Sequence, residues 1–226
     1  MARMDSEQRA RILEAAVGVF AGHGFKGATT RLLGAAAQVN SALIYYYFEN
    51  KETLFAETID MVIHGFLSRL EVGRRAFKDA RDRLDYLAKG LFDYYIAYPE
   101  RRRLMIIALS MHPEMFGRAL GSVLGKRRLL PLDILAEGME RGEIRKMSPI
   151  SAWLNVVGAC MFSFLLREVA PHLGAAPIAL PSLDGEERRR TIVDLLTNGM
   201  RERGENSPGR GGACGSARSN PTGETQ

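Results

Sequence analysis

The sequence predicts an all-α protein in which an N-terminal helix-turn-helix unit of three helices precedes a larger helical domain. Apolar residues recur at spacings of three and four along most of the chain, which is the period of an amphipathic helix. Glycine, proline and helix-capping residues separate these segments, and none of them alternates polar and apolar residues as a half-buried strand does. Of the 226 residues, 46% are hydrophobic and 25% are charged, as is typical of soluble globular proteins.

The first helix is expected to begin near Asp5, whose carboxylate, with Gln8 three residues later, resembles a capping box. Its apolar face comprises Ile12, Leu13, Ala16, Val17 and Phe20. The sequence GHGFKG at 22–27 matches the glycine pattern of dinucleotide-binding folds, but that pattern functions between a strand and a helix. Because a helix precedes it here, we interpret the glycines as the end of that helix.

Two short helices follow, joined by a tight turn. The first opens at Thr29, the turn lies at Gln38–Val39, and Asn40 caps the second helix. Ile44 and Phe48 are four residues apart and therefore share one buried face. The other residues of this helix, Ser41, Ala42, Leu43 and Tyr45 to Tyr47, are left on its outer faces. Small, hydroxylic and aromatic side chains near a helix N-terminus suit the major groove of DNA.

The rest of the chain is expected to form a second domain. Helices are predicted from Asn50 to about Val72, then over 79–98, 100–112, 116–141, 149–170 and about 184–204, with the fourth of these disturbed by Gly121, Gly125 and Pro131. The predicted domains are therefore 1–52, which carries the helix-turn-helix, and 53–204. Residues 205–226 are rich in Gly, Ser and Pro, and we expect a disordered tail.

Four segments of the N-terminal region resemble the DNA-binding domain of TetR-family transcriptional regulators. They are RILEAAVGVFAGHGF (11–25), ATT (28–30), VNSALIYYYF (39–48) and NKETL (50–54). The chain departs from the family pattern at Leu32, where a polar residue is common, at Gly34, where Ala is usual, and at Gln38, where Gly is usual. Tyr47 stands where histidine is common, and a tyrosine can make the same hydrogen bond to phosphate.

The resemblance implies which residues contact DNA. By position, the phosphate contacts fall on Thr29, Tyr45, Tyr46, Tyr47 and Lys51, and the groove-facing contacts fall on Arg31, Asn40, Ser41, Ala42, Leu43 and Tyr45. Lys51 would lie in the first turn of its helix, where free backbone amides also favour a phosphate. The implied protein is a homodimeric, ligand-responsive regulator of a palindromic operator. A repressor is expected, although the sequence does not distinguish repression from activation.

The second domain suggests an effector pocket and a dimer interface. An apolar pocket for a small hydrophobic or aromatic effector is predicted from Phe92, Tyr95, Met105, Leu109, Met111, Met115 and Phe116, although a packed core uses the same residue types. A dimer interface is predicted from Trp153, Val157, Met161, Phe164, Leu165, Ile192, Leu195 and Leu196. The alternative is a buried central helix in a monomer. We expect Arg101–Arg103 to form a solvated helix face.

Other classes of function find less support in the sequence. The four histidines have no partners at ligand spacing, and no nucleophile–base pair emerges, so we expect no metal, cofactor or catalytic site. The net charge of +5 permits DNA as a partner but does not require it. An all-α enzyme or carrier and a protein-binding scaffold remain alternatives, yet both leave the exposed tyrosines without a role. The sequence predicts a cytoplasmic protein for three reasons. It has only two cysteines, it shows no signal-peptide segment, and its apolar run at 152–166 is too short to span a membrane.

Overall fold

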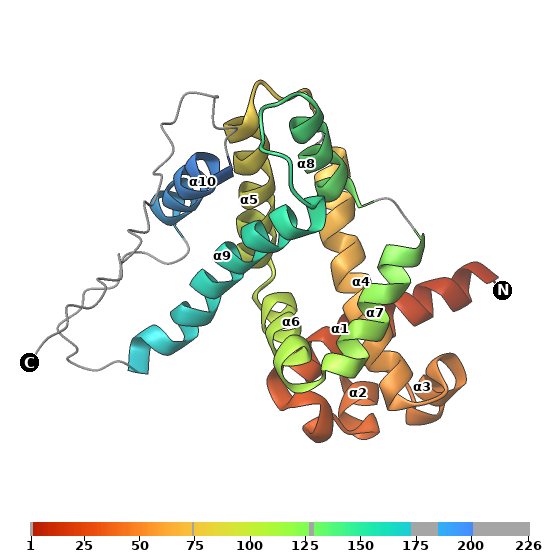
Figure 1. The fold of residues 1–226 in the computed structure, drawn as a ribbon. Coiled ribbons are helices and arrows are strands. Elements are labelled where there is room, and N and C mark those ends of the chain that lie inside the picture. The colour runs from red at the N-terminus through yellow and green to blue at the C-terminus, as the bar shows by residue number, and fades with distance from the viewer. Residues whose placement is uncertain (1, 74, 127–128, 173–184, 201–226) are drawn as a thin grey trace, which may run out of the picture.

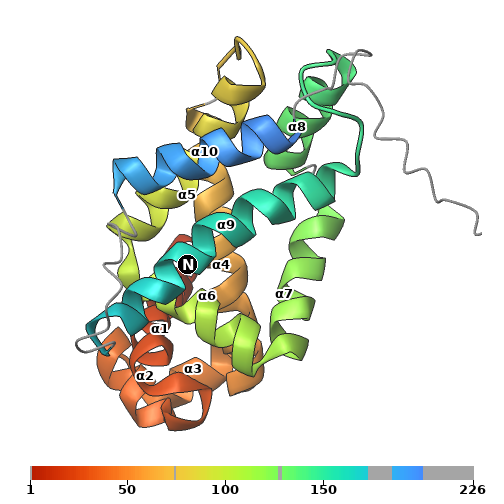
Figure 2. The same cartoon turned by 60° about the vertical axis from the view of Figure 1, so that its left-hand side comes forward.

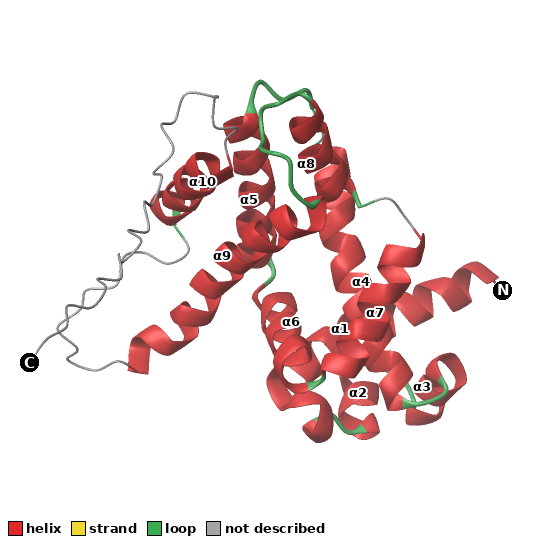
Figure 3. Cartoon of the chain, in the orientation of Figure 1, coloured by secondary structure: helices red, strands yellow, loops and turns green. Residues whose placement is uncertain are grey.

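The computed structural model describes residues 2–73, 75–126, 129–172 and 185–200. Within these ranges the regular structure is entirely helical, which confirms the predicted all-α class (Figure 3). The helices are α1 (Ala2–Gly27), α2 (Thr30–Ala37), α3 (Ser41–Phe48), α4 (Lys51–Val72), α5 (Ala80–Ala97), α6 (Pro99–Met111), α7 (Pro113–Lys126), α8 (Leu130–Glu140), α9 (Pro149–Val169), the short 3-10 helix η1 (Ala170–His172) and α10 (Glu186–Met200). The predicted tail, 205–226, lies outside the described residues.

Helices α1, α2 and α3 form one end of the molecule, with α4 leading away from them (Figure 1). Phe20 of α1 and Phe55 of α4 meet edge to face, with ring centroids 4.8 Å apart. Leu33, Ile44 and Phe48 are buried in the same cluster, so the inward face predicted for α3 is confirmed. These apolar contacts fix the two short helices, which are too short to be stable alone.

Helix α4 continues from this end into the larger domain. Leu54, Phe55 and Ile59 in its first half are fully buried, as is Val62 farther along, and Phe66 is nearly so. Helices α5, α6, α7 and α8 all contact α4. Helices α9 and α10 lie across the outside of α5, as Figure 2 shows. A single hydrophobic cluster therefore runs through both domains.

Two predicted helix boundaries are wrong. Asp5 does not cap α1, because the helix already begins at Ala2 and contains Asp5 in its first turn. The helix expected over 116–141 is divided into α7 and α8, so the disturbance predicted at Pro131 is confirmed, whereas Gly121 and Gly125 lie inside α7. Pro131 lies at the start of α8, where its missing N–H leaves no hydrogen bond unmade, whereas inside a continuous helix it would break one.

A polar contact joins the two domains beside their shared core. Arg101 of α6 forms a two-pronged ion pair with Glu14 of α1, with Nη2 at 2.8 and 2.9 Å from the two carboxylate oxygens. Its Nη1 also donates to the Tyr94 hydroxyl at 3.0 Å, and that hydroxyl donates to the Val62 carbonyl of α4 at 2.9 Å. Helices α1, α4, α5 and α6 are thus connected through one guanidinium group.

The expectation that Arg101–Arg103 form a solvated face is wrong for Arg102. Its side chain is buried, donates to the Tyr95 carbonyl at 3.1 Å, and pairs with Glu168 of α9 at 3.1 Å. The guanidinium also lies 5.2 Å from the centroid of the Phe164 ring. Burial of a charge is tolerated here because a carboxylate and a carbonyl accept its protons.

The turn between α2 and α3 yields a prediction about stability. Gln38 adopts a left-handed conformation, φ 54° and ψ 45°, which is unfavourable for any residue with a Cβ. Gln38→Gly should therefore stabilise the chain by about 1 kcal/mol and raise the Tm by about 2–4 °C in thermal melts.

The matched control is Ala36→Gly, two residues earlier on the exposed side of α2. It should lower the Tm by a similar amount, because glycine is unfavourable inside a helix. A lower Tm for both variants would contradict the conformational account of the turn.

Candidate nucleic-acid interface

The backbone of the helix-turn-helix is fixed by a close approach at Gly34. The Val39 amide donates to the Gly34 carbonyl at 2.9 Å, and a Cβ built at Gly34 would lie only 2.8 Å from the Val39 carbonyl oxygen. The Gln38 amide donates to the Ala35 carbonyl at 3.2 Å. The structure shows what the residues at the two departures from the family pattern do. Gly34 permits the close contact with the Val39 carbonyl because it has no Cβ, and Gln38 adopts the left-handed conformation of the turn.

Three side chains cap the helices of this unit. Thr29 Oγ1 accepts from the Leu32 amide at 3.2 Å, Asn40 Oδ1 from the Ala42 amide at 3.0 Å, and Asn50 Oδ1 from the Thr53 amide at 2.7 Å. Only acceptor capacity is used in these caps. The Thr29 hydroxyl proton and the Asn40 amide protons therefore remain suitable for donation to an oxygen of DNA.

The outer surface of α3 carries two exposed tyrosines. The side chains of Tyr45 and Tyr46 are 52% and 72% exposed, and Ala42 is exposed beside them. Ser41, Leu43 and Tyr47 are half-buried, and Arg31 of α2 is exposed. The predicted DNA contacts therefore lie on α2, on α3 and at the start of α4.

Lys51 is positioned by an aromatic ring that the sequence reasoning missed. Its ammonium nitrogen lies 4.5 Å from the centroid of the Phe25 ring, a cation–π contact. Phe25 follows Gly24, where α1 bends through a positive φ of 65°. The GHGFKG segment thus ends the straight part of α1 and also presents a ring to the lysine. The GHGFKG segment is visible in the sequence, but the contact between Phe25 and Lys51 depends on how α1 and α4 pack.

Comparisons with known proteins identify this unit. Residues 12–58 match the family model described as "Bacterial regulatory proteins, tetR family". The chain therefore carries a TetR-family DNA-binding domain. It is 28% identical over 207 residues to the HTH-type transcriptional repressor NicS of Pseudomonas putida, covering 88% of this chain and 95% of NicS.

Further likenesses agree with this family. The chain is 38% identical over 106 residues to the HTH-type transcriptional repressor SCO4008 of Streptomyces coelicolor, covering 46% of this chain and 52% of that protein. The fold resembles the regulator FadR of Bacillus subtilis, solved in complex with stearoyl-CoA, with a TM-score of 0.67 and 20% identity. That likeness covers 85% of this chain and 99% of FadR, and it concerns the fold alone.

The predicted effector pocket needs correction. Leu109 and Met111 are 60% and 70% exposed, so they do not face the interior that was predicted for them. Phe92 and Tyr95 are buried in the core, where Phe92 lies 5.0 Å from Phe164 between ring centroids. The other members, Met105, Met115 and Phe116, are half-buried.

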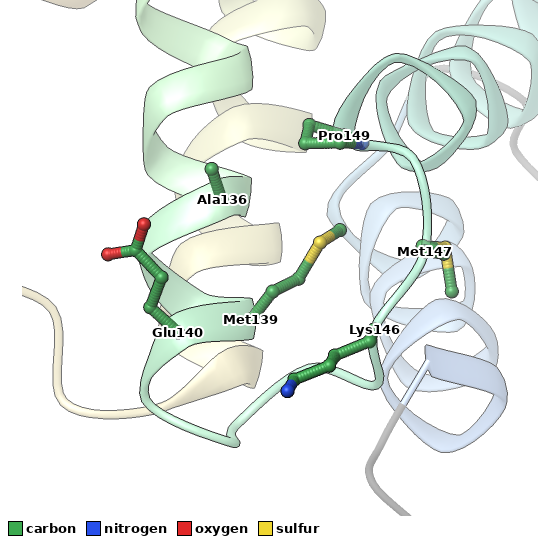
Figure 4. Close-up of a pocket in the computed structure, with 6 residues that line it drawn as sticks. All are labelled: Ala136, Met139, Glu140, Lys146, Met147 and Pro149. Carbon is green, nitrogen blue, oxygen red and sulfur yellow. The ribbon is translucent and has the colours of Figure 1, made fainter.

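Two surface pockets lie elsewhere in the described structure. One, of about 260 Å³, lies between α8, the loop after it and the start of α9, with Met139 pointing toward Pro149 (Figure 4). The other, of about 180 Å³, lies between α1, the start of α6 and Glu168 of α9. Neither is lined by a residue predicted for the effector pocket.

The predicted dimer interface also needs correction at two of its residues. Phe164 and Ile192 are buried within the single chain, so they belong to its core and are not available to a partner. Leu165 and Leu195 are exposed, and Trp153, Val157, Met161 and Leu196 are half-buried. The sequence reasoning missed the exposed apolar residues Leu154, Phe162 and Val169 of α9.

The segment Pro149–His172, comprising α9 and η1, is a 24-residue helix long and apolar enough to cross a membrane by length and composition. It is therefore longer than the apolar run judged from the sequence. Core helices of soluble proteins can have the same length and composition, and this helix contacts α5, α8 and α10. Among the described residues, no cluster of three or more His, Cys, Asp or Glu could hold a metal ion.

Lys51 provides a test of the interface. Lys51→Ala should weaken binding to any DNA duplex and reduce the slope of log affinity against log salt concentration by about one unit, as expected for one lost phosphate contact. Electrophoretic mobility shifts over a salt series measure both quantities.

Lys78→Ala is the matched control, since Lys78 is exposed in the loop between α4 and α5, and this loop lies at the end of α4 that is far from α3 (Figure 1). It removes the same charge and should leave the slope unchanged. Equal slopes for the wild type and Lys51→Ala would exclude Lys51 from the interface.

Proposed function

We propose that this chain is a cytoplasmic, homodimeric transcriptional repressor that binds a palindromic operator through α3 and is released by a small hydrophobic effector. The observation that carries the proposal is the α3 surface: two exposed tyrosines and Ala42 on a helix whose buried side is locked by Ile44 and Phe48. Phosphate contacts from Thr29, the tyrosines and Lys51 would fix the register on DNA. Arg31, Asn40, Ser41 and Leu43 would supply sequence preference.

Repression is favoured over activation by the relatives. Both NicS and SCO4008 are named as transcriptional repressors. As a regulator, the chain would need neither a catalytic residue nor a cofactor. Binding of the protein to DNA upstream of its own gene, together with increased transcription when the protein is absent, is the experiment that tests this function. DNA binding with decreased transcription would indicate an activator.

Dimerisation through α9 and α10 is supported by unpartnered apolar side chains. Leu154, Phe162 and Leu165 are exposed along α9, and Leu195 is exposed on α10. An exposed apolar stripe of this kind is typical of an interface between copies. Two recognition helices related by a twofold axis would meet half-sites about 34 Å apart, one turn of DNA.

An effector would act by favouring a state with different helix spacing. We infer that it enters beside Met105, Met115 and Phe116, the half-buried members of the predicted pocket, on α6 and α7. Arg101, four residues before Met105 on α6, pairs with Glu14 of α1, so a shift of α6 would reach the DNA-binding unit. The complex of FadR with stearoyl-CoA suggests a long acyl chain as one candidate effector.

The dimer proposal predicts the behaviour of Leu154→Glu. Leu154 is 62% exposed, so glutamate is tolerated in the single chain but would place an unpaired charge in the interface. The variant should have half the wild-type mass in solution at micromolar concentration and bind DNA at least tenfold more weakly. Light scattering and mobility shifts measure these properties.

Val72→Glu is the control, because Val72 is an exposed apolar residue at the end of α4. Its mass and DNA affinity should equal those of the wild type. A dimeric Leu154→Glu protein would mean that the interface lies elsewhere.

The effector proposal predicts different effects for two methionines of α6. Stearoyl-CoA or palmitate should release the wild type from DNA, and Met105→Trp should abolish this release while DNA binding persists, because the indole fills the space that the effector would occupy. Met111→Trp, at an exposed position of the same helix, should respond as the wild type does. If neither compound releases the wild type, or if both variants respond equally, this site is wrong.

A further inference from the structure

Tyr47 differs from the other two tyrosines of α3 because its hydroxyl already has a partner. It donates a hydrogen bond of 2.5 Å to the Asp5 carboxylate, which lies in the first turns of α1, 42 residues earlier in the chain. This bond is the main cause that raises the pKa of Tyr47 to about 12, with burial and the charge of Asp5 as further causes. The phenol is protonated at neutral pH, as any tyrosine is, and it donates this proton to Asp5.

The first turns of α1 are held against the end of α3 by a second residue. Arg9, one turn after Asp5, lies with its guanidinium carbon 4.9 Å from the centroid of the Phe48 ring and forms an ion pair with Glu57 of α4. Asp5 is thereby placed next to α3 by the packing of α1 as a whole. The position of α1 beside Tyr47 therefore does not depend on the Asp5–Tyr47 hydrogen bond.

A phenol has a single proton, and an ionised carboxylate can only accept hydrogen bonds. While Asp5 holds the Tyr47 proton, Tyr47 cannot donate to a DNA phosphate. A phosphate close enough to accept from Tyr47 would also lie near the negative charge of Asp5, which repels it. Tyr46, the adjacent residue, is exposed and packs its ring edge to face on Tyr47, and within the described residues its hydroxyl forms no hydrogen bond with a carboxylate.

We propose that Asp5 competes with the DNA backbone for the Tyr47 hydroxyl and thereby sets the affinity of the chain for DNA. This inference rests on the proposed DNA-binding function, and it assigns a residue outside the helix-turn-helix to the control of that site. Asp5 acts through Tyr47 and is not itself a DNA contact. Removal of the carboxylate should free the hydroxyl for a phosphate without changing the fold, since Asp5 is exposed.

The test is a double-mutant cycle with the full chain and a 30-base-pair duplex of random sequence at low salt, because phosphate contacts do not depend on sequence. Asp5→Ala should increase the affinity about three- to tenfold in the wild type, the gain expected from one new hydrogen bond and the loss of one repulsive charge. In the Tyr47→Phe background the gain should fall to about twofold or less, which is the contribution of charge alone. Tyr46→Phe is the matched background, in which the full gain should remain.

Each outcome decides a different point. Equal gains in DNA affinity in the wild-type and Tyr47→Phe backgrounds would show that Asp5 acts only as a charge. No gain in the wild type would show that Asp5 does not compete for the hydroxyl. Either result overturns the inference but leaves the proposed DNA binding intact. Failure of the wild type to bind any duplex would overturn the proposed function, and this inference with it. Thermal melts of the six proteins confirm that the differences do not arise from unfolding.

Discussion

The shared core along α4 is the constraint on which the rest of the structure depends. The first half of α4 packs against Phe20 of α1 and closes the helix-turn-helix unit, while Phe66 and Leu70 in its second half pack within the larger domain. Because buried side chains are close-packed, α4 cannot move in one domain without displacing groups in the other. The orientation of α3 is therefore tied to the state of the larger domain.

The ion pair between Arg101 and Glu14 adds a directional contact to this apolar core. The guanidinium bonds to α1 and to Tyr94, and Tyr94 bonds to the backbone of α4. Arg101 is only partly exposed, so the pair is less screened by solvent than an ordinary surface ion pair. A displacement of α6 would have to break these bonds or carry α1 with it, which gives the helix-turn-helix unit a physical connection to α6.

The sequence was sufficient where local chemistry decides the structure. The cap at Asn40 and the buried pair Ile44 and Phe48 depend on spacing within a few residues, and all were predicted. The helix predicted to open at Thr29 begins at Thr30, with Thr29 as its cap. It was insufficient where neighbouring helices decide which apolar residues are covered. Periodicity identifies an apolar face on α6 or α9, but Leu109 is exposed and Phe164 buried only because of the helices that pack beside them. The contacts of Asp5 with Tyr47 and of Phe25 with Lys51 join residues far apart in the chain, so no local pattern reveals them.

The central claim is that α3, presented twice by a dimer, reads DNA. Hydroxyl-radical footprinting on a genomic fragment recovered with the protein tests it most directly. The account predicts two protected segments about one helical turn apart, centred on a twofold-symmetric sequence, and their loss when Tyr45 and Tyr46 are both replaced by alanine. Protection that persists unchanged in that double variant would show that another surface of the chain binds the DNA, and would contradict the account.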